Sequence, residues 1–119
     1  MLALRIRRPC RAHHTHGAAV HTAWRAFDEN LPERAARLIH EKRMAPAILV
    51  FPDCFTALGG NQYINSSAIG RYADYLTREL IPFVDREFRT LASREHRGCF
   101  GKSSGGYGAM IHGMKYAAH

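Results

Sequence analysis

Hydrophobic residues recur with helical spacing in three segments of the chain. In the first, 28–42, Asn30 can cap a helix, and Pro32 and Glu33 suit its first turn. The apolar positions of this segment fall on one helical face, formed by Leu31, Ala35, Leu38 and Ile39. The pattern predicts a helix over 28–42 that packs through one face.

The second and third segments are 70–89 and 106–118. Pro82 lacks an N–H, and its ring would clash with the carbonyl of Arg78, so we expect a kink or two consecutive helices there. In 70–89 an apolar stripe returns about every fourth residue, and we expect it to pack in the core: Tyr72, Leu76, Leu80, Phe83, Val84 and Phe88. The helix over 106–118 has an apolar face made of Tyr107, Met110, Ile111 and Met114.

Two short apolar runs indicate strands. Residues 47–51 are apolar without alternation and stop at Pro52, which is typical of a strand buried on both faces in a parallel sheet. Residues 97–101 are the second candidate, whereas 53–70 predict a long loop of the kind that is often functional. Residues 1–22 show no consistent period and predict a loop or a disordered segment. Strands that alternate with helices predict an α/β fold, with a parallel sheet flanked by helices.

Charge and length then limit the function classes. The 119 residues carry a net charge of +7 and suffice for one small domain. Five arginines and no acidic residue lie in 1–25, so we expect a basic, poorly ordered arm there and a domain over 26–119. Such an arm can bind nucleic acid or another anionic partner, although it carries no nucleic-acid motif. The chain has no run of 18 apolar residues, so we expect no membrane span. The N-terminal segment lacks the apolar region of a secretory signal, so we expect no such signal.

Three cysteines and eight histidines offer little chemistry by their spacing. Cys10, Cys54 and Cys99 are too few and too far apart for a disulfide framework or a zinc site, which favours a reducing, cytoplasmic location. A histidine cluster at 13–16 lacks Cys, Asp or Glu ligands nearby, and it predicts a polar loop. We expect no metal and no cofactor.

The segment Gly101-Lys102-Ser103-Ser104-Gly105 matches G-x-S-x-G, between a predicted strand and a predicted helix. This is the setting of a nucleophile elbow, a sharp turn that exposes a serine hydroxyl. The positions on either side of the serine must be small so that the helix can pass close to the strand, and Gly101 and Gly105 meet this requirement. The N–H of Ser104, at the helix N-terminus, would be one donor to an oxyanion at Ser103.

Two other interpretations of this segment are open. Gly-Lys-Ser also ends the phosphate-binding loop G-x-x-x-x-G-K-[ST], but that pattern needs glycine where this chain has His96. The segment could also be a glycine-rich turn without chemistry. Against that, five small residues are hard to explain by helix design, since each helical glycine costs about 1 kcal/mol; they are Gly101, Gly105, Gly106, Gly108 and Ala109.

The chain resembles the putative-esterase branch of the α/β-hydrolases, which includes esterase D-type, enterochelin esterase-like and mycolyltransferase-antigen proteins. The stretches that carry the resemblance are PAILVFPDCFTALGGNQYINSS (46–67), YLTRELIPFVDREFR (75–89) and GCFGKSSGGYGAM (98–110). It implies a metal-free serine hydrolase acting on a small ester or thioester, with Ser103 as the nucleophile. It also places 59–63 near the pocket and Gly17 in a second oxyanion loop.

The same resemblance implies a partial hydrolase fold without its C-terminal strands. In the family an acid and then a histidine follow the serine, but only 16 residues follow Ser103. His112 and His119 do not match the family histidine, and no pattern assigns His96 or Asp53 to the triad. We therefore expect little or no turnover from this chain alone. The alternatives are a separate chain that supplies the acid and histidine, or a non-catalytic module whose arm binds an anion.

Overall fold

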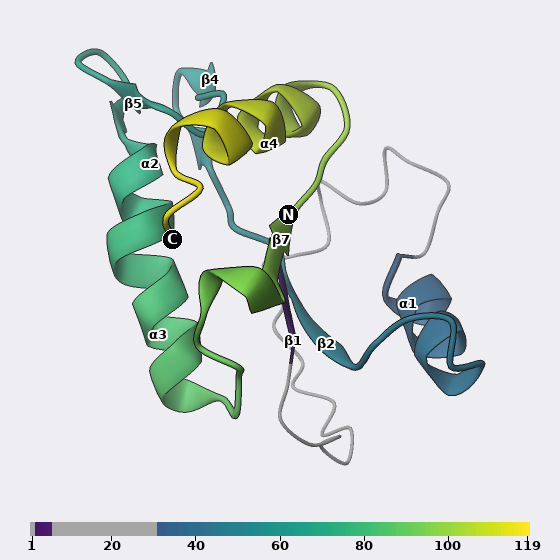
Figure 1. Cartoon of the computed structure of the whole chain (residues 1–119). Helices are drawn as coiled ribbons and strands as arrows, with labels where there is room; N and C mark the ends of the chain where they lie inside the picture. Colours follow the sequence, from purple (N-terminus) through teal and green to yellow (C-terminus); the bar gives the residue numbers. More distant parts are fainter. Residues whose placement is uncertain (1, 6–30) are drawn as a thin grey trace.

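The computed structural model describes residues 2–5 and 31–119 (Figure 1). A three-stranded sheet has the order β2-β1-β7, with β1 (Leu2–Arg5) in the middle, β2 (Ala47–Val50) on one side and β7 (Arg97–Cys99) on the other. Helix α1 (Leu31–His40) and the long helix that contains α2 and α3 (72–87) flank these strands on opposite sides, and α4 (Ser104–Lys115) lies beyond the end of β7 (Figure 1).

The parallel sheet predicted from the sequence is wrong for the described strands. β1 is antiparallel to both neighbours, with Leu2 opposite Val50 of β2 and Cys99 of β7. β2 and β7 thus run in the same direction but do not pair, because β1 lies between them. β1 comes from a segment that predicted loop, and its place in the middle makes β2 an edge strand of this sheet. All four residues of β2 are accordingly half-buried rather than buried on both faces.

The predicted first helix is confirmed as α1, Leu31–His40, with Ala35 buried. Its end explains an unusual backbone conformation. Lys42 has φ 58°, its N–H donates to the Ile39 carbonyl (3.1 Å), and the Arg43 N–H donates to the Leu38 carbonyl (2.9 Å). This pair of bonds is the Schellman motif, in which a left-handed residue ends the helix. The residues before Leu31 lie outside the described part of the chain, and so does the predicted cap, Asn30.

The second predicted helix runs without a break through α2 (Tyr72–Asp74), a π-helical segment η2 (Tyr75–Leu80) and α3 (Ile81–Glu87). The predicted disturbance at Pro82 takes the form of this π segment. The Ile81 N–H donates to the carbonyl of Leu76, five residues back, immediately before the proline that has no N–H to donate.

The buried face of this helix is rotated from the predicted stripe. It consists of Ala73, Thr77, Ile81 and Val84, and the Thr77 hydroxyl donates to the Ala73 carbonyl (2.8 Å). Of the residues predicted to pack in the core, Val84 is buried as expected, whereas Phe83 and Phe88 are about half exposed. Spacing alone located the helix but did not identify which residues of its apolar side meet a neighbour.

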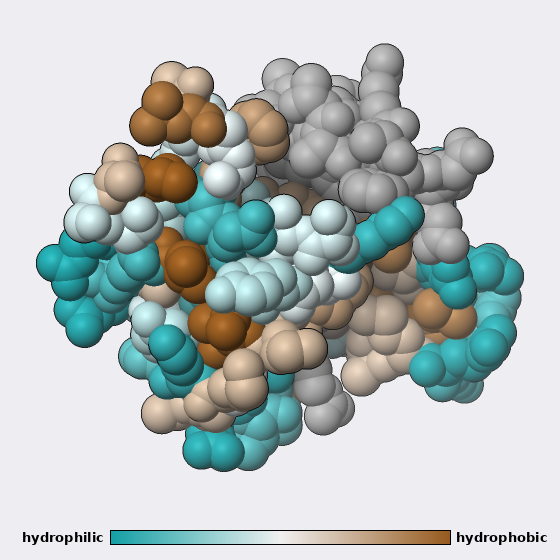
Figure 2. Space-filling view, turned by 90° about the horizontal axis from the view of Figure 1, so that it is seen from above, coloured by the Kyte–Doolittle hydropathy of each residue, from teal (hydrophilic) through white to brown (hydrophobic). Residues whose placement is uncertain are grey.

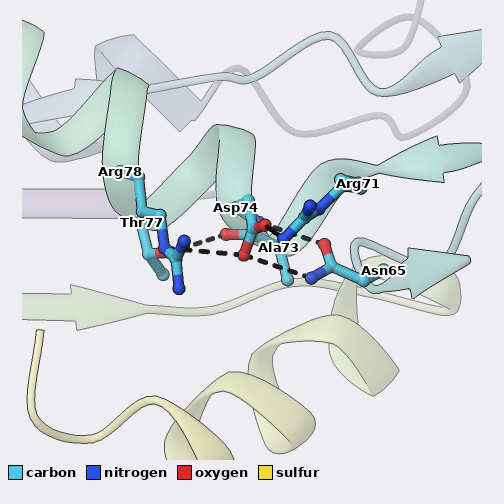
Figure 3. Close-up of polar contacts among 6 residues, drawn as sticks. All are labelled: Asn65, Arg71, Ala73, Asp74, Thr77 and Arg78. Atoms are coloured by element: carbon cyan, nitrogen blue, oxygen red, sulfur yellow. Dashed lines mark hydrogen bonds and ion pairs between the residues drawn. The ribbon is translucent and has the colours of Figure 1, made fainter.

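Asp74 fastens the start of this helix to the loop that precedes it (Figure 3). Its carboxylate accepts from the Asn65 amide (3.1 Å), and its backbone N–H donates to the Asn65 side-chain oxygen (3.1 Å). Arg71 and Arg78 reach the same carboxylate from either side. The Asn65 hydrogen bond first, and then the Arg71 hydrogen bond and charge, lower the pKa of Asp74.

At the other end of the helix, Asp85 joins α3 to β7. Its carboxylate pairs with the Arg97 guanidinium and accepts a hydrogen bond from the Thr90 hydroxyl (2.6 Å).

The predicted loop 53–70 contains two small hairpins. β3 (Phe55–Thr56) pairs with β4 (Gly59–Gly60), and β5 (Asn65–Ser66) with β6 (Gly70–Arg71).

After β7, the helix predicted over 106–118 is α4, Ser104–Lys115. Its apolar face is present but largely exposed, at 65% for Met110 and 66% for Met114. Seen from above (Figure 2), hydrophobic side chains lie on this surface among polar ones. In the described part of the chain, no helix has the length and apolar character needed to cross a membrane.

Candidate active site at the turn between β7 and α4

Ser103 lies on a tight turn between the end of β7 at Cys99 and the start of α4 at Ser104. Its backbone angles are φ 54° and ψ −124°, outside the regions that L-residues normally occupy. Such a conformation costs on the order of 1–3 kcal/mol and persists only where the surroundings enforce it. Two bonds do so here: the Tyr107 N–H donates to the Ser103 carbonyl and the Gly105 N–H to the Lys102 carbonyl, both at 3.0 Å.

The two glycines of the motif have different surroundings. A Cβ atom at Gly101 would lie 2.3 Å from the carbonyl carbon of Gly105, so the strand and the helix approach each other closely at this point. A Cβ atom at Gly105 would meet nothing within 4 Å. The close approach expected from the motif therefore requires a residue without a side chain at position 101. At position 105 only the backbone takes part in the contact, and a side chain would have room.

The N-terminus of α4 presents backbone donors beside Ser103. Ser104 is the first residue of this helix, and the first N–H groups of a helix have no partner within it. Its N–H has no backbone acceptor among residues 2–5 and 31–119. The helix dipole adds partial positive charge at the same place. Gly17, the second predicted donor, lies outside the described residues.

Ser103 opens onto a hollow of about 460 Å³, which we call the Ser103 hollow. It is lined by Gln62, Ile64, Ser103, Ser104 and Tyr107. Three of these residues come from the turn and from α4, while Gln62 and Ile64 come from the long loop. The loop predicted to be functional therefore supplies part of the wall around the predicted serine.

Four residues, which we call the Tyr63 clasp, hold this part of the loop against α4: Asn61, Tyr63, Gly108 and His112. The buried Asn61 side chain donates to the Cys54 carbonyl (2.7 Å) and accepts from the Tyr63 N–H (2.7 Å). His112 Nε2 lies 2.8 Å from the Tyr63 carbonyl. Because a carbonyl only accepts, this nitrogen carries the proton.

The Tyr63 ring completes the clasp by lying on Gly108, where a Cβ atom would come within 2.7 Å of Tyr63 Cδ2. Sequence reasoning missed the clasp. The one signal in the sequence was Gly108 within a helical pattern, because an interior glycine weakens a helix and points to close approach by another group.

Among residues 2–5 and 31–119, no histidine or carboxylate is hydrogen-bonded to the Ser103 hydroxyl. His112 is bonded to Tyr63, and its ring lies 4.9 Å from that of Tyr116. The Asp53 carboxylate accepts from the Phe55 N–H (3.0 Å). His96 is half-buried, and its Nδ1 has no described partner. The described residues bring a strained serine and a helix N-terminus together, without a general base.

Cys54, whose carbonyl accepts a hydrogen bond from Asn61 of the clasp, is shielded from solvent. Its side chain is buried, and burial first, then the Asp53 charge, raises its pKa from 9.0 to about 11. The fold thus favours the neutral thiol. This contribution to stability is present below pH 9 and is lost as the pH rises through about 11.

We expect iodoacetamide to alkylate Cys54 about 100-fold more slowly in the folded chain at pH 8 than in urea, since two pKa units remove about 99% of the thiolate. Peptide mapping by mass spectrometry measures the rate, with the exposed Cys99 as the internal comparison. Equal rates for Cys54 in the folded and unfolded chain would contradict its burial.

Comparison with known proteins finds a matching family and similar sequences. A family model described as "Putative esterase" matches residues 25–119. Two curated proteins, Esterase MT1326 and Esterase Rv1288 from two strains of Mycobacterium tuberculosis, are each 35% identical to the chain over 80 residues. The match covers 62% of this chain and 16% of each relative, so the chain spans only a small part of their length. None of the solved structures compared with the chain matches it.

Proposed function

Since the chain belongs to the putative esterase family, we propose that it carries the nucleophile of a serine ester-hydrolase site and that this nucleophile is Ser103. The observation that carries the proposal is the backbone of Ser103, strained between β7 and α4 at the mouth of an open hollow. Strain of this kind gathers at functional sites. The family implies an α/β-hydrolase-like fold, in which such a turn exposes the nucleophile.

The reaction would proceed through an acyl-enzyme. Ser103 Oγ attacks the ester carbonyl carbon, and the carbonyl electron pair moves to oxygen, giving a tetrahedral oxyanion. The N–H of Ser104 is one donor to that oxyanion, and Gly17 is proposed as the second. Collapse expels the alcohol or thiol, which takes up a proton. Water then attacks the acyl carbon, the bond to Ser103 Oγ breaks, the acyl group leaves as a carboxylic acid, and Oγ regains the proton that it lost in the first step.

This reaction requires a general base beside Ser103. A serine hydroxyl is a weak nucleophile near pH 7 unless an adjacent base accepts its proton. No such group contacts Ser103 within the described part of the chain. We therefore propose that these 119 residues alone turn over esters slowly or not at all, although Ser103 stays the most reactive hydroxyl.

Labelling with an alkyl fluorophosphonate tests the proposal without requiring turnover. Ser103 Oγ attacks phosphorus, the P–F bond breaks, fluoride leaves with the electron pair, and the hydroxyl proton passes to buffer. At pH 9 we expect labelling at Ser103 to be at least ten times faster than at Ser67, because the strained turn and the helix N-terminus favour the developing negative charge.

Tandem mass spectrometry assigns the adduct, and Ser104→Ala is the matched control beside Ser103→Ala. The N–H of residue 104 survives in the alanine variant, so labelling is expected to persist there and to vanish in Ser103→Ala. Labelling spread evenly over the hydroxyls would contradict the assignment of Ser103. Rapid hydrolysis of a chromogenic ester, lost in Ser103→Ala, would contradict the proposed lack of turnover.

A further inference from the structure

In the part of the chain that the structure describes, backbone strain is concentrated around the Ser103 hollow. Among the described residues, four that are not glycine have positive φ: Lys42, Gln62, Tyr63 and Ser103. The Schellman motif at the end of α1 accounts for Lys42. Gln62 (φ 59°) and Tyr63 (φ 64°) are consecutive, and Gln62 shares the lining of the hollow with Ser103. A helix end does not explain these two residues.

The Tyr63 clasp enforces this conformation from both sides. Asn61 binds the Tyr63 N–H, and His112 binds the Tyr63 carbonyl, so the peptide groups on either side of Tyr63 are fixed. The Tyr63 ring on Gly108 prevents the loop from sliding along α4. The residues before and after Tyr63 are Gln62 and Ile64, and both line the hollow. The clasp therefore determines the position of the wall that faces Ser103.

The contacts of the clasp do not explain why a glutamine occupies position 62, where the backbone is left-handed. Glycine or asparagine adopts a left-handed backbone more easily than glutamine does. The Gln62 side chain is exposed, and its carboxamide has no hydrogen bond to any residue of 2–5 or 31–119. It thus offers one acceptor and two donors to whatever occupies the hollow.

We propose that Gln62 is a specificity-determining residue that hydrogen-bonds a polar group of the substrate at Ser103. The substrate class is esters that carry an amide or hydroxyl group close to the reacting carbonyl, rather than plain alkyl esters. Asn61, Tyr63 and His112 are positioning residues, because they act only through the place they give to Gln62. This inference rests on the proposed function of Ser103.

Two fluorophosphonates of equal chain length test the inference on the full chain. One carries an amide near phosphorus, and in the other a pair of methylene groups replaces the amide. The measured quantity is the ratio of their second-order labelling rates at Ser103. One good hydrogen bond changes a rate by about five- to tenfold, so we expect the amide probe to react about five times faster. The ratio should fall to about one in Gln62→Gly.

Gln62→Gly is chosen because glycine adopts φ 59° without strain, so this variant is expected to fold. Lys42→Gly is the matched control, since it relieves a left-handed residue far along the sequence from the hollow and should leave the ratio unchanged. His112→Leu removes the donor to Tyr63 and should lower the ratio, whereas His112→Gln keeps a donor and should restore it.

The outcomes separate the two proposals. Selective labelling of Ser103 with the same ratio in wild type and Gln62→Gly would overturn the role of Gln62 and leave that of Ser103 intact. A ratio of one in the wild type would do the same. Labelling no faster at Ser103 than at Ser67 would overturn the proposed function and this inference together.

Discussion

Replacing Gly101 by alanine is expected to cost about 3 kcal/mol or more of folding free energy. The new methyl group would lie 2.3 Å from the Gly105 carbonyl carbon and 2.4 Å from its oxygen. Both are backbone atoms of the first turn of α4, so no side chain can rotate away. Either the helix start moves away from β7 or the turn opens, and both changes remove the strained conformation of Ser103.

Urea denaturation followed by circular dichroism measures the stability change, and fluorophosphonate labelling reports on the turn. Gly105→Ala is the matched control, because a Cβ atom there meets nothing within 4 Å. We expect Gly105→Ala to be neutral or to stabilise by up to about 1 kcal/mol through helix propensity. Equal stabilities for the two variants would show that β7 and α4 do not approach each other as described.

Much of the local structure could be predicted from the sequence. Spacing located α1 and the helix of 72–87, and Pro82 marked the place where the backbone departs from α-helical bonding. The turn at Ser103 was predicted from five consecutive residues, because the motif encodes local backbone geometry. These features depend on residues near one another in the chain, so their signals are local too.

Strand pairing and burial could not be predicted in the same way. Leu2–Arg5 is too short and too close to arginines to show a strand period, yet it pairs with two strands and makes the sheet antiparallel. Likewise, Met110 and Met114 have helical apolar spacing but are exposed. Spacing shows that a helix has an apolar face, but not that another element covers it.

The Tyr63 clasp shows the same limit within the candidate site. Tyr63 and His112 are 49 residues apart in sequence, and no local pattern links them. The left-handed backbone of Gln62 and Tyr63 was equally hidden, since neither residue type favours it. Contacts between α4 and the loop impose that conformation, whereas the composition of 53–70 predicted only that the segment is a loop. The wall of the hollow is therefore a tertiary feature, unlike the turn.

Replacing Gly108 by alanine should break this tertiary feature and cost about 2 kcal/mol. The new methyl group would meet Tyr63 Cδ2 at 2.7 Å and Tyr63 Cβ at 2.9 Å. The ring could rotate, but Cβ is fixed to a backbone that Asn61 and His112 hold on either side. The higher helix propensity of alanine recovers only about 1 kcal/mol, so the net effect is destabilising.

A double-mutant cycle, read by urea denaturation, assigns that loss to the clasp. Tyr63→Gly removes both the ring and Cβ, and it suits the left-handed backbone at φ 64°. In that background Gly108→Ala should no longer destabilise, which gives a coupling of about 2 kcal/mol or more between the two positions. Gly113→Ala on the same helix, where a Cβ atom meets nothing within 4 Å, should stabilise in both backgrounds. Additive effects of the Tyr63 and Gly108 changes would mean that the ring does not lie on α4, and the position of Gln62 would then need another cause.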